Sequence, residues 1–184
     1  HWRIQMANYV TTFNRLYQAG FSPNLVERPR LEKHLQKALN DVVKMRGLIT
    51  PASKETHIQK AIFEAIQTVS RNLVCMLELQ INAYWASRQG HFVMLNAQTL
   101  RETQRMTQQT LLTIAHALYE GNPQPVRANT EKLNEIVVEL RQLIKEHQDD
   151  NLSETPIHGY VWLTIELARQ LELLSHLICR ALRK

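Results

Sequence analysis

Histidine and cysteine side chains are the residues of this chain best suited to bind a metal, and their spacing does not favour a site. None of the eight histidines lies three or four residues from another, so no single helical face presents two of them to one ion. The sequence contains no HExxH, no Cys-x-x-Cys and no Glu-x-x-His, the pair that builds metal sites in helical bundles. The histidines are residues 1, 34, 57, 91, 116, 147, 158 and 176.

Carboxylates and glycines give no clearer sign of catalysis. Glu146, His147 and the two following aspartates are interpreted as a polar helix end that leads into a loop. Three glutamates lie on apolar helical segments where arginines offer ordinary pairing partners: Glu78, Glu166 and Glu172. The five glycines are too far apart for a phosphate-binding loop. We therefore predict no catalytic, cofactor-binding or metal-binding residue, and a protein that is not an enzyme.

Several reactive or aromatic side chains are better explained by packing. Cys75 and Cys179 lie in apolar helical patterns, which predicts buried free thiols rather than a disulfide. His116 and His176 lie beside apolar stripes and are expected in the core or at its boundary. The tryptophans are expected to pack at helix ends with their indole N–H groups hydrogen-bonded. The alternative is an aromatic anchor at a membrane interface or subunit contact. They are Trp2, Trp85 and Trp162.

The net charge of +5 is concentrated near the amino terminus. Residues 1–50 contain 8 Lys and Arg against 3 Asp and Glu, and Arg180, Arg183 and Lys184 form a second small cluster. Such an excess can attract phosphate in anionic lipid or nucleic acid. Nucleic acid is not favoured, because these cations share a helix with an apolar stripe and have no interleaved aromatic residues. A solvated basic face is the simpler interpretation.

The elements that must position these side chains are helices. With 5 Gly and 6 Pro in 184 residues, the chain has too few turn formers for a sandwich or barrel of short strands. No 18-residue window is apolar enough to span a bilayer. The glycines and prolines cluster at five places and divide the chain into six segments with a period near 3.6 residues.

These segments predict an all-α antiparallel bundle of five to six helices in which sequential neighbours pack together. One helix is expected to be long, at about 52–88. The helix between 125 and 148 is expected to begin near Asn129 or Thr130 as a cap, and the last helix to follow Gly159. The other helices are predicted at about 2–19, 29–48 and 91–120. The whole of 1–184 is predicted to be a single helical soluble domain.

The stretch from Asn96 to Thr110 is unusual because it is polar nearly all round, with Leu100 and Met106 as its large apolar groups. A helix of this kind either projects into solvent or meets a partner. It is interpreted as a solvated helix or as a loop between two shorter helices. The alternative is a polar contact face for another subunit or domain.

Three stretches resemble one family of membrane proteins. Residues 159–174 (GYVWLTIELARQLELL), with Leu177, Ile178 and Arg180 beyond them, look like the last helix of the soluble carboxyl-terminal part of fusaric acid resistance-like (FUSC) inner-membrane proteins. Residues 72–85 (NLVCMLELQINAYW) and 116–121 (HALYEG) are similar to the same region. The resemblance implies a bacterial protein with two groups of transmembrane helices, each followed by a cytosolic helical region.

The function implied by this resemblance is that of a cytosolic domain in a transporter of aromatic-acid or fusaric-acid efflux type, with a structural or coupling role. The chain would then be a fragment on the cytoplasmic side of the inner membrane. Its partners would be its own transmembrane region and possible other copies, and residues 1–50, with Trp2 and Arg3, would lie near anionic head groups. The family supplies no catalytic motif. The alternative is a freestanding helical regulator that binds protein or nucleic acid.

Overall fold

The computed structural model describes residues 1–22, 28–87, 97–146 and 155–183, and nearly all of them are α-helical. The described residues include no strand, which confirms the all-α prediction. Six long helices form the bundle and one short helix is added at its end. The helices are α1 (Trp2–Phe21), α2 (Arg28–Arg46), α3 (Ile49–Thr56), α4 (Lys60–Ser87), α6 (Ala97–Glu120), α7 (Gln124–Glu146) and α8 (Thr155–Ala181).

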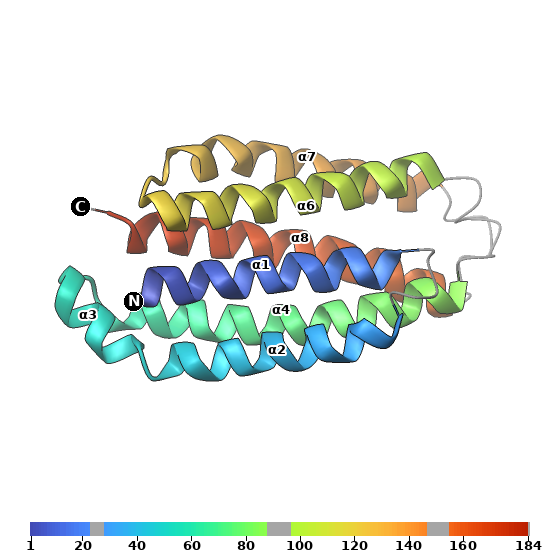
Figure 1. Ribbon diagram of the computed structural model, residues 1–184. Helices are drawn as coiled ribbons and strands as arrows, with labels where there is room; N and C mark the ends of the chain where they lie inside the picture. Colours follow the sequence, from blue (N-terminus) through green and yellow to red (C-terminus); the bar gives the residue numbers. More distant parts are fainter. Residues whose placement is uncertain (23–27, 88–96, 147–154, 184) are drawn as a thin grey trace.

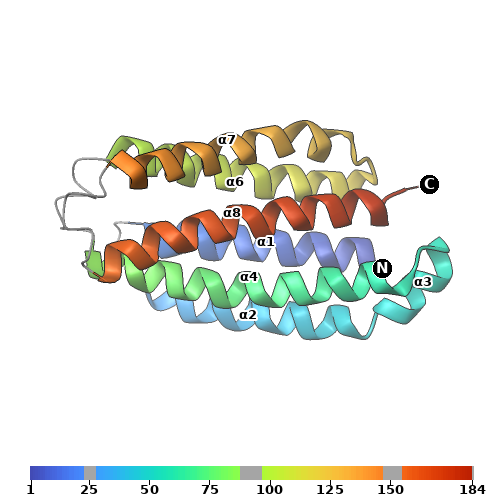
Figure 2. The ribbon, with the colours of Figure 1, turned by 180° about the vertical axis from the view of Figure 1, so that it is seen from behind.

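The six long helices form a closed ring in the order α1, α6, α7, α8, α4, α2. Figures 1 and 2 show that neighbours in this ring run in opposite directions, with α1 and α8 between the α6–α7 pair and the α2–α4 pair. Sequential helices pack together as predicted, except that α4 and α6 are not ring neighbours. Helix α1 contacts both of them, because its buried residues cover more than one face of the helix.

The core runs along the whole bundle and is rich in aromatic side chains near the middle and at one end. Tyr9, Phe13 and Tyr17 of α1 are almost fully buried. Phe21 lies edge-on to Tyr84 of α4, with ring centroids 5.2 Å apart, and near Tyr160 of α8. These contacts join α1, α4 and α8, three helices that are far apart in the sequence.

The predicted long helix at about 52–88 is wrong at its amino-terminal end. The chain forms α3, leaves the helical conformation at His57, where φ is +57°, and resumes as α4 at Lys60. The hydroxyl of Ser53 donates a hydrogen bond to the Ile58 carbonyl (2.7 Å), and the Thr56 hydroxyl accepts one from the Ile58 N–H (3.3 Å). At the break, the backbone groups of Ile58 thus bond to serine and threonine hydroxyls instead of to helical backbone groups. The spacing of the apolar residues shows no interruption there.

Two other predicted helix starts are also wrong. Helix α7 begins at Gln124, so Asn129 and Thr130 lie inside it. Asn129 is buried and donates to the Thr110 hydroxyl (2.7 Å), and the Thr130 hydroxyl donates to the Val126 carbonyl (3.1 Å). Gly159 lies within α8 instead of preceding it. In each case the residue type suits a helix end, but packing against a neighbour extends the helix beyond it.

The polar stretch at 96–110 becomes part of a continuous helix from Ala97, which excludes a loop between two short helices in that part. Its threonines Thr103, Thr107 and Thr110 are at most 5% exposed and follow Leu100 along one face. Each hydroxyl donates to the carbonyl four residues earlier, at 2.8–2.9 Å. Threonine therefore serves here as a core residue, so this stripe is not solvated, while a contact with another subunit through the exposed face of the helix stays a prediction.

Buried polar pairs also fix how the helices sit against each other. Asp41 of α2 is 4% exposed and accepts hydrogen bonds from Thr12 of α1 and from Lys37, at 3.2 and 3.3 Å. Gln80 of α4 donates to the Thr164 hydroxyl of α8 at 2.8 Å, with both side chains buried. Because an unpaired buried polar group is costly, such pairs favour one register of the helices over its neighbours.

Candidate functional site

The residues considered for chemistry are not brought together in the described ranges. No group of three or more His, Cys, Asp or Glu side chains there is placed to hold a metal ion. Glu166 pairs with Arg169 at 3.1 Å, as predicted, whereas Glu172 lies 3.8 Å from His176 and Glu78 is exposed. His147 and the aspartates after it lie outside the described residues.

Two predictions about burial are wrong. His116 and His176 are exposed rather than at the core boundary. Cys75 is exposed, whereas Cys179 is buried as predicted, with both thiols free. His116, His176 and Cys75 are each next to apolar residues in the sequence but lie on the solvent-facing side of the helix. A shift of one position rotates a side chain by about 100°, which is enough to move it from the core to the solvent.

The three tryptophans have different environments. The Trp85 indole N–H donates to the Gly20 carbonyl at 2.6 Å, which confirms the predicted partnered packing for this residue. Trp2 is 8% exposed and meets Phe63 edge-on, with centroids 4.9 Å apart. Trp2 thus packs at the start of α1, as predicted for a helix end, and its proximity to anionic head groups stays a prediction of the family resemblance. Trp162 is 57% exposed, so the packing prediction is wrong there.

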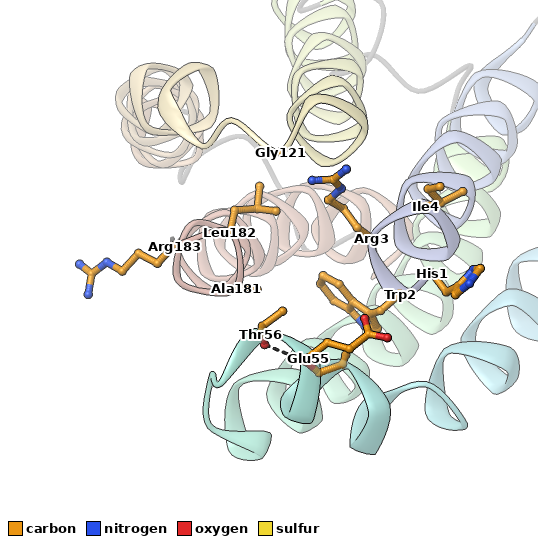
Figure 3. Close-up of a pocket in the computed structure, with 11 residues that line it drawn as sticks. His1, Trp2, Arg3, Ile4, Glu55, Thr56, Gly121, Ala181, Leu182 and Arg183 are labelled. Atoms are coloured by element: carbon orange, nitrogen blue, oxygen red, sulfur yellow. Dashed lines mark hydrogen bonds between the residues drawn. The ribbon is translucent and has the colours of Figure 1, made fainter.

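One end of the bundle holds the start of α1, the end of α8, the short helix α3 and the turn between α6 and α7 (Figure 1). A pocket of about 300 Å³ opens among these elements. Figure 3 shows Arg3 directed toward the turn at Gly121, and Arg183 directed away from the pocket on the other side of α8. The rest of the lining combines the polar residues His1, Glu55 and Thr56 with the apolar residues Trp2, Ile4, Ala52, Ala181 and Leu182.

The turn at Gly121 is shaped by its glycine. Gly121 has φ +72°, and its N–H donates to the Ala117 carbonyl at 2.8 Å, which ends α6 in the usual left-handed manner. A Cβ at this position would overlap the guanidinium of Arg3. The polar side chains that line the pocket are thus those of His1, Arg3, Glu55, Thr56 and Arg183.

The basic excess of residues 1–50 is spread along the bundle rather than gathered. Helices α1 and α2 are antiparallel, so Arg30 and Lys33 at the start of α2 lie at the opposite end from Arg3, Lys44 and Arg46. The end that holds both termini receives further cations from other helices. They are Lys54 in the last turn of α3, Arg127 near the start of α7, Arg180 in the last turn of α8, and Arg183 just after α8.

Arg127, Arg180 and Arg183 surround a second pocket of about 460 Å³ between α7 and α8, together with Thr130, His176 and Cys179. The Cys179 thiol donates to the Pro123 carbonyl at 3.8 Å and so ties α8 to the start of α7. Burial raises the pKa of this thiol, against the effect of the neighbouring Arg127. Sequence reasoning identified Arg180 and Arg183 as a cluster but missed Arg127, because the cluster forms only when α7 and α8 pack.

The fold is a helical bundle with two pockets at one end, one of which is lined by three arginines. In comparison with known proteins, the chain is 72% identical over all 184 residues to the inner membrane protein YeeA of Escherichia coli (strain K12). The chain spans about half of that relative, 52% of its length.

Other comparisons return no match. No family model matches the chain, so membership of the FUSC family stays a prediction. No solved structure matches it either. Among the described residues, each helix is too short or too polar to cross a bilayer. The similarity thus links this bundle to an inner membrane protein, while the described helices are not themselves membrane spans.

Proposed function

We propose that this chain is the cytosolic helical domain of a bacterial inner-membrane transport protein, where it has a structural or coupling role. The observation that carries the proposal is the 72% identity to one half of an inner membrane protein of Escherichia coli. At that level of identity two chains share their fold and most of their surface. The proposed substrate class, aromatic acids or fusaric acid, rests on the resemblance of residues 72–85, 116–121 and 159–174 to efflux proteins.

The lengths of the two proteins support a complete protein in which the membrane-spanning helices lie outside the matched region. Nearly half of the relative lies outside the matched region. We propose that the complete protein places its membrane-spanning helices there, because the described helices are not apolar enough for that role. The described bundle would then be joined to the membrane through the rest of the chain.

The charge distribution supports one orientation relative to the membrane. Basic residues lie in the last turns of α2, α3 and α8, which share the end of the bundle that holds both termini: Lys44, Arg46, Lys54 and Arg180. Anionic lipids of a cytoplasmic leaflet attract such residues by about 1 kcal/mol each when they are near the surface. We therefore propose that this end faces the bilayer and that the opposite end faces the cytosol.

The packing of the bundle suits a coupling role. Its helices form a closed ring and are linked by the buried pairs Asp41–Thr12, Gln80–Thr164 and Asn129–Thr110. A bundle tied in this way moves as one body, so a displacement at its membrane-facing end reaches the other end. This property supports mechanical coupling between parts of a transporter, or contact between subunits, rather than chemistry.

Topology and fractionation of the complete protein test the proposal. The complete protein should remain in the inner-membrane fraction after alkaline carbonate washing, and a reporter that is active only in the cytosol should be active when fused after Lys184. Residues 1–184 alone should be released by the same wash. Recovery of the complete protein in the soluble fraction would favour the freestanding regulator instead.

The cargo class is tested separately. Cells that lack the complete protein should accumulate more of a labelled aromatic acid than cells that contain it. Equal accumulation over a panel of aromatic acids would contradict efflux of this class while leaving the membrane location intact.

A further inference from the structure

Three arginines from distant parts of the sequence line the pocket between α7 and α8. Arg127 comes from the second turn of α7, Arg180 from the last turn of α8, and Arg183 lies just after that helix ends. Thr130, His176 and Cys179 complete the lining, so the six described lining residues include no acidic side chain. The His176 imidazole lies 3.8 Å from the carboxylate of Glu172, one turn earlier in α8.

Helix chemistry explains part of this arrangement but not all of it. A cation in the last turn of a helix is favourable because the helix dipole is negative there, which accounts for Arg180. Arg127 lies at the opposite, positive end of α7, where a cation is unfavourable. Its guanidinium also adds to the charge of two neighbouring ones. In the described ranges none of the three arginines forms a salt bridge within 4.0 Å.

We propose that this pocket binds the phosphate group of an anionic ligand. Three guanidinium forks offer more donors than a carboxylate with two oxygens can accept, whereas a phosphate group has the additional acceptors and charge. The Thr130 hydroxyl and the His176 imidazole lie on the same lining and supply further polar contacts. A volume of about 460 Å³ accommodates a phosphate together with part of the molecule that carries it.

The phosphate can belong to a soluble metabolite or to a lipid head group. Both sources share the chemistry that the arginines recognise. The proposal does not depend on the membrane role proposed above, since a soluble protein with this pocket would bind the same group.

The test compares two double variants of the 184-residue chain that lose the same charge. Arg127→Gln with Arg180→Gln removes two arginines of the pocket. Arg101→Gln with Arg105→Gln removes two exposed arginines of α6 that do not line it. Pyrophosphate binding is measured by titration calorimetry, and vesicle binding by flotation with phosphatidylcholine alone or mixed with phosphatidylglycerol.

The pocket variant should lose about tenfold or more in affinity, since each charged hydrogen bond to phosphate contributes substantially. The α6 variant should change much less, and binding by the original chain should weaken as salt is added. Binding of pyrophosphate alone would assign the site to soluble ligands, and binding of anionic vesicles alone to lipid head groups. No binding in either arm, or equal losses in the two variants, would overturn the proposal.

A stability measurement separates ligand recognition from a purely structural role. Arg127→Gln should raise the melting temperature without added anion, because it removes a cation from the positive end of α7. The same variant should show a smaller rise in melting temperature on addition of pyrophosphate than the original chain. A lower melting temperature without anion, together with an unchanged pyrophosphate effect, would mean that Arg127 supports the fold instead.

Discussion

Two helical glycines in this chain differ in the space around them. Gly159 lies inside α8 with nothing within 4 Å of where a Cβ would be. Gly20 lies in α1 where a Cβ would overlap the buried side chain of Ile81, and its carbonyl accepts the Trp85 hydrogen bond. Glycine is needed for close approach at residue 20 but is merely tolerated at residue 159.

We predict that Gly159→Ala stabilises the protein by about 0.5–1 kcal/mol, because alanine lowers the entropy cost of forming a helix. The matched substitution Gly20→Ala should destabilise it by about 1–3 kcal/mol through overpacking against Ile81. Urea unfolding of both variants measures the difference. Equal effects at the two positions would contradict the packing described for α1 and α4.

Buried tyrosines make stability depend on alkaline pH. Burial raises the pKa of Tyr160 to about 12, against the smaller effect of its hydrogen bond from Gln104, and burial also raises the pKa values of Tyr9 and Tyr17. The unfolded chain loses these protons near pH 10 while the folded chain keeps them. Each such tyrosine therefore contributes stability that is complete below about pH 10 and is lost as the pH rises.

We predict that the free energy of unfolding falls above about pH 10, and that Tyr160→Phe makes the fall shallower by up to about 1.4 kcal/mol per pH unit between 10 and 12. Guanidinium unfolding at a series of alkaline pH values measures the slope. A slope that is the same with and without Tyr160 would show that its hydroxyl ionises freely in the folded protein.

At the scale of elements, the most informative helix is α6. Its composition suggests exposure, yet its threonine stripe faces α1 and α7. Threonine can be buried at low cost because its hydroxyl donates to the helix backbone and its methyl group packs as an apolar group. Hydrophobic patterning misses such a stripe, since it treats threonine as polar.

We predict that Thr107→Lys destabilises the protein by about 3 kcal/mol or more, because it places a charge in the core without a partner. Gln109→Lys, two residues away on an exposed face of α6, should change stability by less than about 0.5 kcal/mol. Thermal unfolding of the two variants provides the comparison. Similar melting temperatures would contradict the burial of Thr107 and favour the solvated helix that the sequence suggests.

At the scale of the whole molecule, the ring is closed by α8. This helix packs against α4 and α7, and its Thr164 accepts a hydrogen bond from Gln80, which is 84 residues earlier. Without α8, the buried faces of both neighbouring helices would be exposed to water. The contacts that close the ring are therefore long-range in the sequence, although each helix is local.

We predict that a chain ending at residue 154 does not unfold cooperatively and binds dyes that report exposed apolar surface. A chain ending at Leu182, which keeps all of α8, should unfold in one transition like the complete chain. Circular dichroism during urea titration distinguishes the two. A sharp transition in the shorter chain would show that the remaining helices form a stable core by themselves.

The amino-acid sequence by itself determined the fold class, most helix positions and the helical stripes that form the core, because these depend on the period of apolar residues and on glycine and proline. The end of α2 before Gly47 and the apolar face of α8 were predicted in this way. The break at His57 was not, because it depends on hydrogen bonds from Ser53 and Thr56 within a stretch whose apolar period is unbroken.

Only the tertiary structure decided which helices are neighbours and which charged residues share a surface. Arg127 and Arg180 are 53 positions apart, and neither carries a local signal that would pair it with the other. They line one pocket because α7 and α8 pack side by side and antiparallel. Local patterns arise from interactions within a few residues, whereas the pocket arises from burial of apolar faces between distant segments, which no short window of sequence contains.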